Sequence, residues 1–389
     1  MSVYVYNAKR SPIGKFKKSF ANTSCRRLGY QVATSLFNDL NIKTKEVDKV
    51  YVGNVLSAGL GQNIARQILI DTGVSIDKCA TSVNMVCGSG LKAVSIAYND
   101  IVLHQAHLII AGGVENMSMS PLLKNRLNED ANLIDHMTYD ALTDVFNDYH
   151  MGITAENIAL KYNITREEQD MFALSSQKKV QEAIREKKFI QEITPIKNLE
   201  GVIINQDEFP RADCDLEKLG SLKPAFKQDG TVTAGNASGI NDGAAFVLIG
   251  DETINAKPLV EIIDFAEVGC EPEYMGLGPV EAINRILENN NLKLDDIDLL
   301  EINEAFASQS IAVIKELAKK HNIDEEKFNK RINVNGGAIA LGHPVGASGA
   351  RILITLIYEL KRRKQKYGIA SLCIGGGMGI AILIKNVEE

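Results

Sequence analysis

Several features are scarce or missing in this 389-residue sequence, and each shortage narrows the possible functions. Basic residues form neither a stripe nor a tail, and the formal net charge of −6 argues against binding to nucleic acids or membrane surfaces. The start, "MSVYVYNAKRSPIG", contains no apolar signal core, so a cytoplasmic protein is expected rather than a secreted one. The six cysteines include no CxxC pair and no Cys/His cluster with zinc spacing, which predicts free thiols and no metal site.

One uncharged stretch, from Tyr367 to Ile384, is close to the length of a membrane span. Glycines interrupt its middle in "IGGGMG", and the flanks "IASLCI" and "IAILI" have the composition of buried strands. The pattern therefore predicts a core hairpin with a glycine turn. A dinucleotide site would need a helix after the glycines, and here a strand-like run follows them.

The sequence also indicates an internal repeat within an alternating α/β pattern. "KEVDKVYVGNV" and "LDDIDLLEINE" both run from an acidic turn through a strand to an asparagine, and a helix follows each. After them, two longer segments both run from Val-Asn through a glycine loop and a helix to a strand with Gly-Gly. This alignment matches Ser89-Gly90 with Ser348-Gly349 and Gly112-Gly113 with Gly375-Gly376. Two similar halves would bring equivalent loops together, with a charged insertion between Met117 and Gly243 that carries binding rather than the core fold.

Two residues in these loops could activate a nucleophile. Cys87 lies where a strand-like run ends in "VCGSG" and a helix begins, a position expected to lower the thiol pKa, and the glycines would leave room for a substrate carbonyl. His343, in "GGAIALGHPVGASGAR", is the candidate base, because a Cys–His pair needs no metal and glycine-loop N–H groups can hold an oxyanion. Cys373, before "GGGMG", suggests a second proton-transfer step. A buried core residue is the alternative interpretation of each cysteine.

Seven motifs, in order, resemble those of the thiolases. They are "NMVCGSGLKA", "AGGVENMS", "YHMGITAEN", "TAGNASGINDGA", "INEAFA", "GGAIALGHPVGASGAR" and "LCIGGGMG". The resemblance covers nearly the whole chain and implies an α/β fold with a five-layered αβαβα core of two similar halves. The implied boundaries are 1–117 with 244–262 for the N-terminal half, 118–243 for an inserted loop domain that binds coenzyme A, and 263–389 for the C-terminal half.

The resemblance also implies catalytic roles. Cys87 would be the nucleophile that takes the acyl group, and His343 would be its base. His343 would form one oxyanion hole with a water held by Asn303, and the N–H groups of Cys87 and Gly375 would form the other. Cys373 would be the acid/base for the α-carbon proton.

The same resemblance places coenzyme A on the insertion. Arg211, Phe226 and Ser238 would line its site, and His150 and Met151 in "YHMG" resemble the short-chain, acetoacetyl-CoA type. The basic residues that suit its phosphates are Arg211, Lys218, Lys223 and Lys227. Coenzyme A thioesters are substrates here, so no cofactor is expected.

The implied activity is condensation of two acetyl-CoA to acetoacetyl-CoA plus CoA, and the reverse thiolysis. A broader 3-ketoacyl-CoA thiolase of fatty-acid breakdown is the alternative within the family. Two further alternatives are a non-catalytic thiolase-like partner in a multienzyme complex and a Cys–His hydrolase, which would leave Cys373 without a role. The expected partners are acetyl-CoA, acetoacetyl-CoA, CoA and further copies of the chain, as a homotetramer or homodimer, without nucleic acid or membrane.

Overall fold

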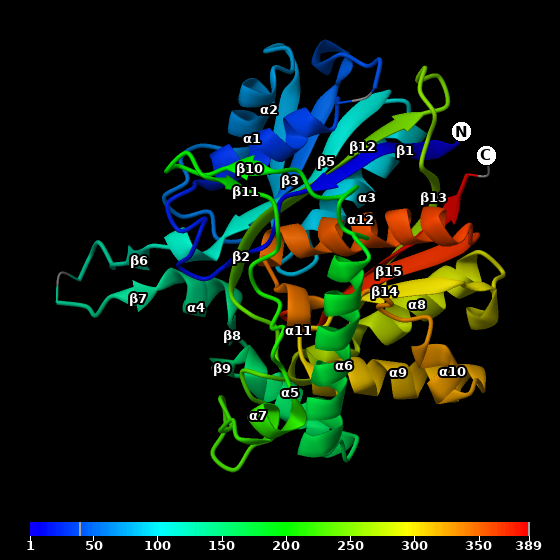
Figure 1. The fold of residues 1–389 in the computed structure, drawn as a ribbon. Helices are drawn as coiled ribbons and strands as arrows, with labels where there is room; N and C mark the ends of the chain where they lie inside the picture. Colours follow the sequence, from blue (N-terminus) through cyan, green and yellow to red (C-terminus); the bar gives the residue numbers. More distant parts are fainter. Residues whose placement is uncertain (39, 129, 388–389) are drawn as a thin grey trace.

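The fold is built on one large mixed sheet. The computed structural model describes residues 1–38, 40–128 and 130–387. Within these ranges, ten strands form the sheet (Figure 1). Nine of them lie side by side in the order β14 (Leu299–Ile302), β15 (Tyr367–Ile374), β16 (Met378–Asn386), β13 (Val260–Gly269), β1 (Val3–Arg10), β12 (Asn241–Asp251), β5 (Leu108–Asn116), β3 (Lys49–Gly53) and β4 (Cys79–Val83), and β2 (Gly14–Lys15) pairs with β12.

The strand order is symmetric about its middle, which confirms the predicted repeat. Reading outward from the centre, β1, β12, β5 and β3 mirror β13, β16, β15 and β14. The two central strands carry the same irregularity, because β1 shifts register at Asn7 and β13 at Asp264. Each of these side chains accepts a hydrogen bond from the next backbone N–H, that of Ala8 or Phe265.

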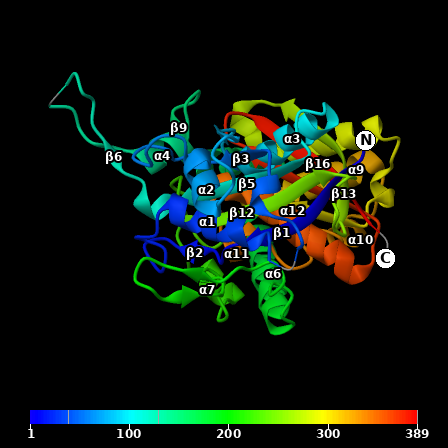
Figure 2. The same cartoon turned by 90° about the horizontal axis from the view of Figure 1, so that it is seen from above.

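Helices cover both faces of each half-sheet. One outer layer contains α1 (Cys25–Ser35) and α2 (Ile64–Thr72), the middle layer α3 (Ser89–Val102) and α12 (Val345–Arg363), and the other outer layer α8 (Gly278–Asn289) and α9 (Ala307–His321). Three apolar clusters fill the spaces, and successive residues of β5 alternate between two of them, as a strand buried on both faces requires. The predicted five-layered αβαβα core is confirmed (Figures 1 and 2).

The glycine-rich end of the chain is the predicted hairpin. Strands β15 and β16 are antiparallel and fully paired, and Gly376 and Gly377 turn between them with positive φ angles of 87° and 84°. The expected match of Gly112-Gly113 with Gly375-Gly376 is wrong. The register shifts at Asn7 and Asp264 make their partners Leu248 and Leu383 equivalent. These residues pair in turn with Ile110 of β5 and Ile369 of β15, which sets Gly112-Gly113 level with Ser371-Leu372.

Among the described residues, those between β5 and β12 add no strand to the central sheet. They form the short elements η2 (Met117–Met119), β6 (Leu122–Leu123), β7 (Ile134–Asp135), α4 (His136–Ala141), β8 (Thr143–Asp144), β9 (Tyr149–His150), α5 (Met151–Lys161), β10 (Ile196–Lys197), β11 (Ile203–Ile204) and α7 (Leu216–Gly220). The long helix α6 (Arg166–Arg185) begins with a capping box between Thr165 and Glu168. Strands β6 and β7 project away from the body (Figure 1).

The remaining short elements connect the layers. They are η1 (Thr44–Glu46), η3 (Pro272–Leu277), η4 (Leu294–Asp296), α10 (Glu325–Asn329) and α11 (Ala338–Leu341). None of the helices formed by the described residues combines the length and hydropathy that a membrane span needs.

Candidate active site

A cavity of about 450 Å³ brings residues of both halves together with residues between β5 and β12. Cys87 and His343 both lie on its wall. Five further residues expected from the sequence also line it, namely His150, Met151, Arg211, Phe226 and Ser238. Residues far apart in the chain therefore share one concave and mostly apolar site, the form usual for a small-molecule pocket.

Cys87 is presented by a strained turn between β4 and α3. The preceding residue, Val86, has a φ of 45°, an unfavourable conformation for a β-branched side chain. Ser89 holds this turn, because its hydroxyl donates to the carbonyl oxygen of Val86 at 2.6 Å and accepts from the N–H of Met85 at 2.8 Å. The strain is thus maintained at the residue before the thiol.

The pKa of the Cys87 thiol is raised, whereas the sequence predicts a lowered one. Burial raises the pKa of Cys87 to about 11, although the backbone N–H groups of Gly375 and of Cys87 itself act to lower it. The negative charge of Glu115 adds to the rise. Helix α3 begins only at Ser89, so removal of the sulfur from water outweighs the stabilisation that the helix start was expected to give.

The glycines after Cys87 also have a different purpose from the one expected. A Cβ atom on Gly88 would lie 2.5 Å from the Ile374 side chain, and one on Gly90 would lie 2.8 Å from the carbonyl oxygen of Gly346 in α12. These glycines allow close packing of α3 against the second half, and the space beside the Cys87 sulfur is supplied by the cavity that this residue lines.

His343 is a neutral base with one free nitrogen. Its backbone N–H donates to Asn241 Oδ1 at 3.0 Å, and its Nδ1 lies 2.6 Å from the hydroxyl of Ser348. That hydroxyl donates to the carbonyl oxygen of Pro344 at 2.9 Å, so Nδ1 carries the imidazole proton. Nε2 has no hydrogen-bond partner among the described residues, and burial, helped by the charge of Arg351, lowers the His343 pKa to about 4.

Cys373, Asn303 and Gly375 lie behind the cavity wall. Burial raises the Cys373 pKa well above its usual value, and the charge of Cys87 raises it further, which indicates that the two thiols are neighbours. Asn303 follows β14 and is fully buried, yet both polar atoms of its side chain lack partners within the described ranges. Gly375 directs its N–H at the Cys87 sulfur, and a Cβ there would lie 3.3 Å from the Met151 sulfur.

Aromatic side chains form another part of the wall. His150 stacks on Phe226 with 4.5 Å between ring centroids and 19° between planes, and Phe226 meets Phe306 edge-on at 6.1 Å. A side chain on Gly152 would collide with the Phe226 ring, and the Gly152 N–H donates to His150 Nδ1 at 3.0 Å. The glycine in "YHMG" therefore positions both rings.

The basic residues expected at the phosphates are not gathered in one place. Arg211 lines the cavity and lies over the Phe209 ring, 5.4 Å from its centroid. Lys218 instead forms an ion pair with Asp213 at 2.9 Å and does not line the cavity, and neither do Lys223 and Lys227. Lys15 of β2 also lines the cavity, and no motif singled it out because it lies more than a hundred positions before the inserted segment that carries Arg211.

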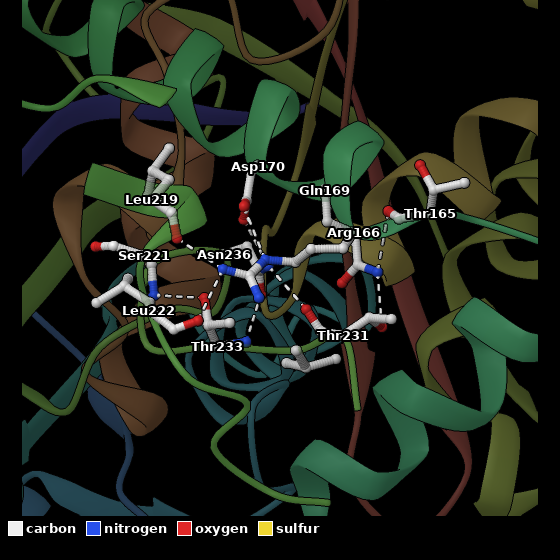
Figure 3. Close-up of polar contacts among 12 residues, drawn as sticks. Thr165, Arg166, Gln169, Asp170, Leu219, Ser221, Leu222, Thr231, Thr233 and Asn236 are labelled. Carbon is white, nitrogen blue, oxygen red and sulfur yellow. Dashed lines mark hydrogen bonds and ion pairs between the residues drawn. The ribbon is translucent and has the colours of Figure 1, made fainter. Parts of the chain in front are cut away.

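A polar network holds the loop that carries Phe226 and Ser238 (Figure 3). Arg166 Nε donates to Asp170 at 2.7 Å, and its Nη2 donates to the carbonyl oxygens of Leu219 at 2.6 Å and Leu222 at 3.0 Å. Asp170 also accepts from the side chain of Asn236 at 2.9 Å. The loop is thereby tied to the first turns of α6.

The same loop is joined to the second half by its backbone. The Ala307 N–H donates to the Asn236 carbonyl oxygen, and the Ser238 N–H donates to the Ala305 carbonyl oxygen, both at 2.9 Å. This contact sets Ser238 on the cavity wall beside the segment that follows Asn303. Sequence reasoning singled out the motif "TAGNASG" but missed Asn236 as its anchor.

Comparison with known families gives an independent test of the resemblance. The family described as thiolase, N-terminal domain, matches residues 3–253, and thiolase, C-terminal domain, matches residues 256–386. The chain belongs to the thiolase family. The resemblance carried by the seven motifs is confirmed, and as a thiolase the protein is an acyltransferase.

Individual thiolases resemble the chain over its whole length. It is 48% identical to "Acetyl-CoA acetyltransferase" of Escherichia coli over 99% of each chain. It is 46% identical to the protein of the same name from Chromobacterium violaceum, over 99% of this chain and all of the relative. The structure of human mitochondrial 3-ketoacyl-CoA thiolase in complex with CoA superposes with a TM-score of 0.93 at 38% identity, covering 99% of this thiolase and 98% of the human chain.

Proposed function

We propose that this thiolase condenses two molecules of acetyl-CoA to acetoacetyl-CoA with release of CoA, and catalyses the reverse thiolysis. The observation that carries the proposal is the bare Nε2 of His343 on the same cavity wall as the Cys87 thiol, with a second thiol, Cys373, beside it. The identity of 48% to an acetyl-CoA acetyltransferase supports acetyl-CoA as the substrate.

In the first half-reaction, the Cys87 sulfur attacks the carbonyl carbon of acetyl-CoA. His343 Nε2 takes the thiol proton and returns it to the departing CoA sulfur, which leaves acetyl-Cys87 and CoA–SH. The N–H groups of Cys87 and Gly375 donate to the oxyanion formed on the attacked carbonyl, and such donors are worth about 3–4 kcal/mol each.

In the second half-reaction, Cys373 removes a proton from the methyl group of a second acetyl-CoA. The resulting carbanion attacks acetyl-Cys87, forms the new carbon–carbon bond and expels the Cys87 thiolate, which takes a proton from His343. Before that transfer, His343 Nε2, which holds the proton that Cys373 gave up on ionising, donates to the enolate oxygen together with a water held by Asn303.

Coenzyme A itself is assigned to the inserted residues 118–243. Arg211, Phe226, Ser238, His150 and Met151 would contact it along the cavity wall, where all five lie. The complex of the human relative with CoA supports CoA as a ligand. The two halves, residues 1–117 with 244–262 and residues 263–389, would supply the reacting groups. Coenzyme A thioesters are substrates of this chemistry, which supports a role in acyl-CoA and lipid metabolism. The proposed location is the cytoplasm.

The assembly proposed is a homodimer or homotetramer. Strand β4 ends the sheet with mostly exposed side chains, and an open edge strand is suited to pairing with a second copy. The projection that carries β6 and β7 exposes Leu122, Leu127 and Leu133, an apolar surface unusual for an isolated monomer. Light scattering of the purified protein would distinguish the two assemblies.

The test of the activity is an assay with acetoacetyl-CoA and CoA, which should yield two acetyl-CoA. Equal rates on longer 3-ketoacyl-CoA substrates would favour the broader thiolase. Release of free acetate without CoA would indicate a hydrolase. Absence of any turnover, or of acetyl transfer to Cys87, would contradict the proposed function.

A further inference from the structure

A buried carboxylate outside the proposed reaction steps connects the two halves beside the site. Glu115, near the end of β5, is fully buried. Its Oε2 accepts from the N–H groups of Gly346 at 2.9 Å and Val55 at 3.0 Å. Its Oε1 accepts from the side chain of Asn54 at 2.9 Å and the N–H of Leu56 at 3.1 Å. Four donors at one carboxylate offset part of the free-energy cost of burying its negative charge.

The donors come from two different places. Asn54, Val55 and Leu56 form the loop after β3, in the first half, whereas Gly346 lies in the first turn of α12, in the second. Helix α12 has no side-chain cap of its own, so the carboxylate supplies the negative group that a helix N-terminus favours.

The helix end is seated directly on β5. A Cβ atom on Gly346 would lie 2.7 Å from Glu115 Oε2, and one on Gly113 would collide with the carbonyl oxygen of Gly346. The first turn of α12 therefore has a single close-fitting position against this strand. His343 lies three residues before Gly346, so the position of that turn determines where the imidazole stands.

The other side of this contact adjoins the thiol. Val55 and Leu56 share a buried apolar cluster with Val345, and Cys87 packs against that cluster. The residues that Glu115 holds are thus the immediate neighbours of the proposed nucleophile and of the proposed base.

We propose that Glu115 is a positioning residue, whose carboxylate fastens the first turn of α12 to the loop after β3 and so fixes the His343 imidazole relative to the Cys87 thiol. The inference rests on the acetyl transfer proposed above. Glu115 touches no reacting atom, and its effect is on the acetylation step and not on coenzyme A binding. Misplacement of a catalytic group by about 1 Å can lower a rate roughly 100-fold.

Protonation of Glu115 should loosen the contact, because a protonated oxygen would face an N–H donor. Burial raises the Glu115 pKa to about 7, although the N–H groups of Val55, Leu56 and Gly346 act to lower it. The ionisable groups that influence or are influenced by Glu115 are Asp242 of β12, whose own pKa burial raises to about 6, Cys25 of α1, and Cys87. Acetylation of Cys87 should therefore slow as the pH falls through about 7.

The test uses Glu115→Gln in the full-length enzyme, with single-turnover acetylation by acetyl-CoA and alkylation by iodoacetamide as separate readouts. Acetylation should slow by about 10- to 100-fold, with less than about a twofold change in KM. Alkylation should stay equal or rise, because loss of the negative charge lowers the Cys87 pKa. The acid midpoint of the acetylation profile should move below that of the wild type.

Glu156→Gln is the matched control. Glu156 is also a buried carboxylate that accepts from backbone N–H groups, those of Thr231 and Val232, but it supports the coenzyme A loop. This variant should raise KM while acetylation at saturating acetyl-CoA is retained. Slower acetylation in Glu115→Gln and a higher KM in Glu156→Gln would show that the effect of Glu115 comes from positioning His343. It would not come from the loss of a buried carboxylate in general.

Glu115→Asp covers the case in which the glutamine variant does not fold. Its shorter carboxylate keeps the charge but cannot reach all four donors, so acetylation should fall while the acid limb near pH 7 persists. Wild-type acetylation rates in either variant, parallel loss of acetylation and alkylation, or an unchanged acid midpoint in Glu115→Gln would each overturn the inference. A wild-type enzyme that acetyl-CoA does not acetylate would instead contradict the proposed function.

Discussion

The resting thiol of Cys87 should react slowly with iodoacetamide. A free cysteine with a pKa of about 8.5 is about one-quarter thiolate at pH 8. A thiol whose pKa burial has raised to about 11 is only about one part in a thousand thiolate at that pH. Because only the thiolate is alkylated, Cys87 should react about 200-fold more slowly than a free thiol, and its rate should still be rising with pH at pH 9.

The assay is peptide mass spectrometry after timed alkylation between pH 6 and pH 10. Free cysteine alkylated under the same conditions provides the reference rate. His343→Ala supplies a second arm. With its pKa lowered to about 4, the imidazole is uncharged at pH 8, so its loss should change alkylation by less than about threefold. The same variant should slow acetylation by acetyl-CoA by about 10²–10⁴-fold, because the thiol then loses its base.

A preformed thiolate–imidazolium pair would give a different result. Alkylation of Cys87 would then reach a plateau near pH 6–7 and would fall sharply in His343→Ala. That outcome would refute the reasoning from burial. It would mean that the dipole and N–H groups near Cys87 outweigh the loss of water around the sulfur.

Three further results are expected. Cys373→Ala should still be acetylated on Cys87 but should lose condensation by about 10²–10⁴-fold, together with deuterium exchange into the methyl group of acetyl-CoA, and retention of exchange would contradict its role. Arg211→Ala should raise KM for coenzyme A substrates with kcat little changed, whereas Lys218→Ala, at the exposed ion pair with an aspartate, should match the wild type in steady-state kinetics. Gly90→Ala should lower stability by about 1–3 kcal/mol, because its Cβ would meet the backbone of α12, and calorimetry that shows an unchanged Tm would contradict that close contact.

The features that could be predicted from the sequence are those that depend on residues close together in the chain. The hairpin around Gly376 follows from apolar strands on both sides of a glycine run, and the two-half architecture follows from repeated strand–loop–helix order. The positions of Cys87 and His343 in glycine loops were enough to suggest a thiol and a base. The structure places both on one cavity wall, together with residues that the family resemblance implied.

The predictions that were wrong concern features that depend on contacts between segments far apart in the chain. The Cys87 pKa is set by burial, which the adjacent sequence does not reveal, and its glycines face Ile374 and α12 instead of a ligand. Residue type matches Gly112-Gly113 with Gly375-Gly376, and only the hydrogen-bond register of the strands shows that it lies level with Ser371-Leu372. Glu115 carries no motif signal of its own, because its four donors are assembled only by the fold.

The place of β1 at the centre of the sheet also sets the order in which the chain can fold. This strand is synthesised well before both of its neighbours in the sheet, since Val3 pairs with Asp251 and with Ile262. Closing a loop of roughly 250 residues costs about 5 kcal/mol of chain entropy. The nascent chain must therefore keep β1 unpaired until most of the protein has been made, including every residue between β5 and β12. Long-range pairing of this kind makes folding slow. The unpaired backbone of β1 makes the incomplete chain prone to aggregation, and chaperones bind such chains.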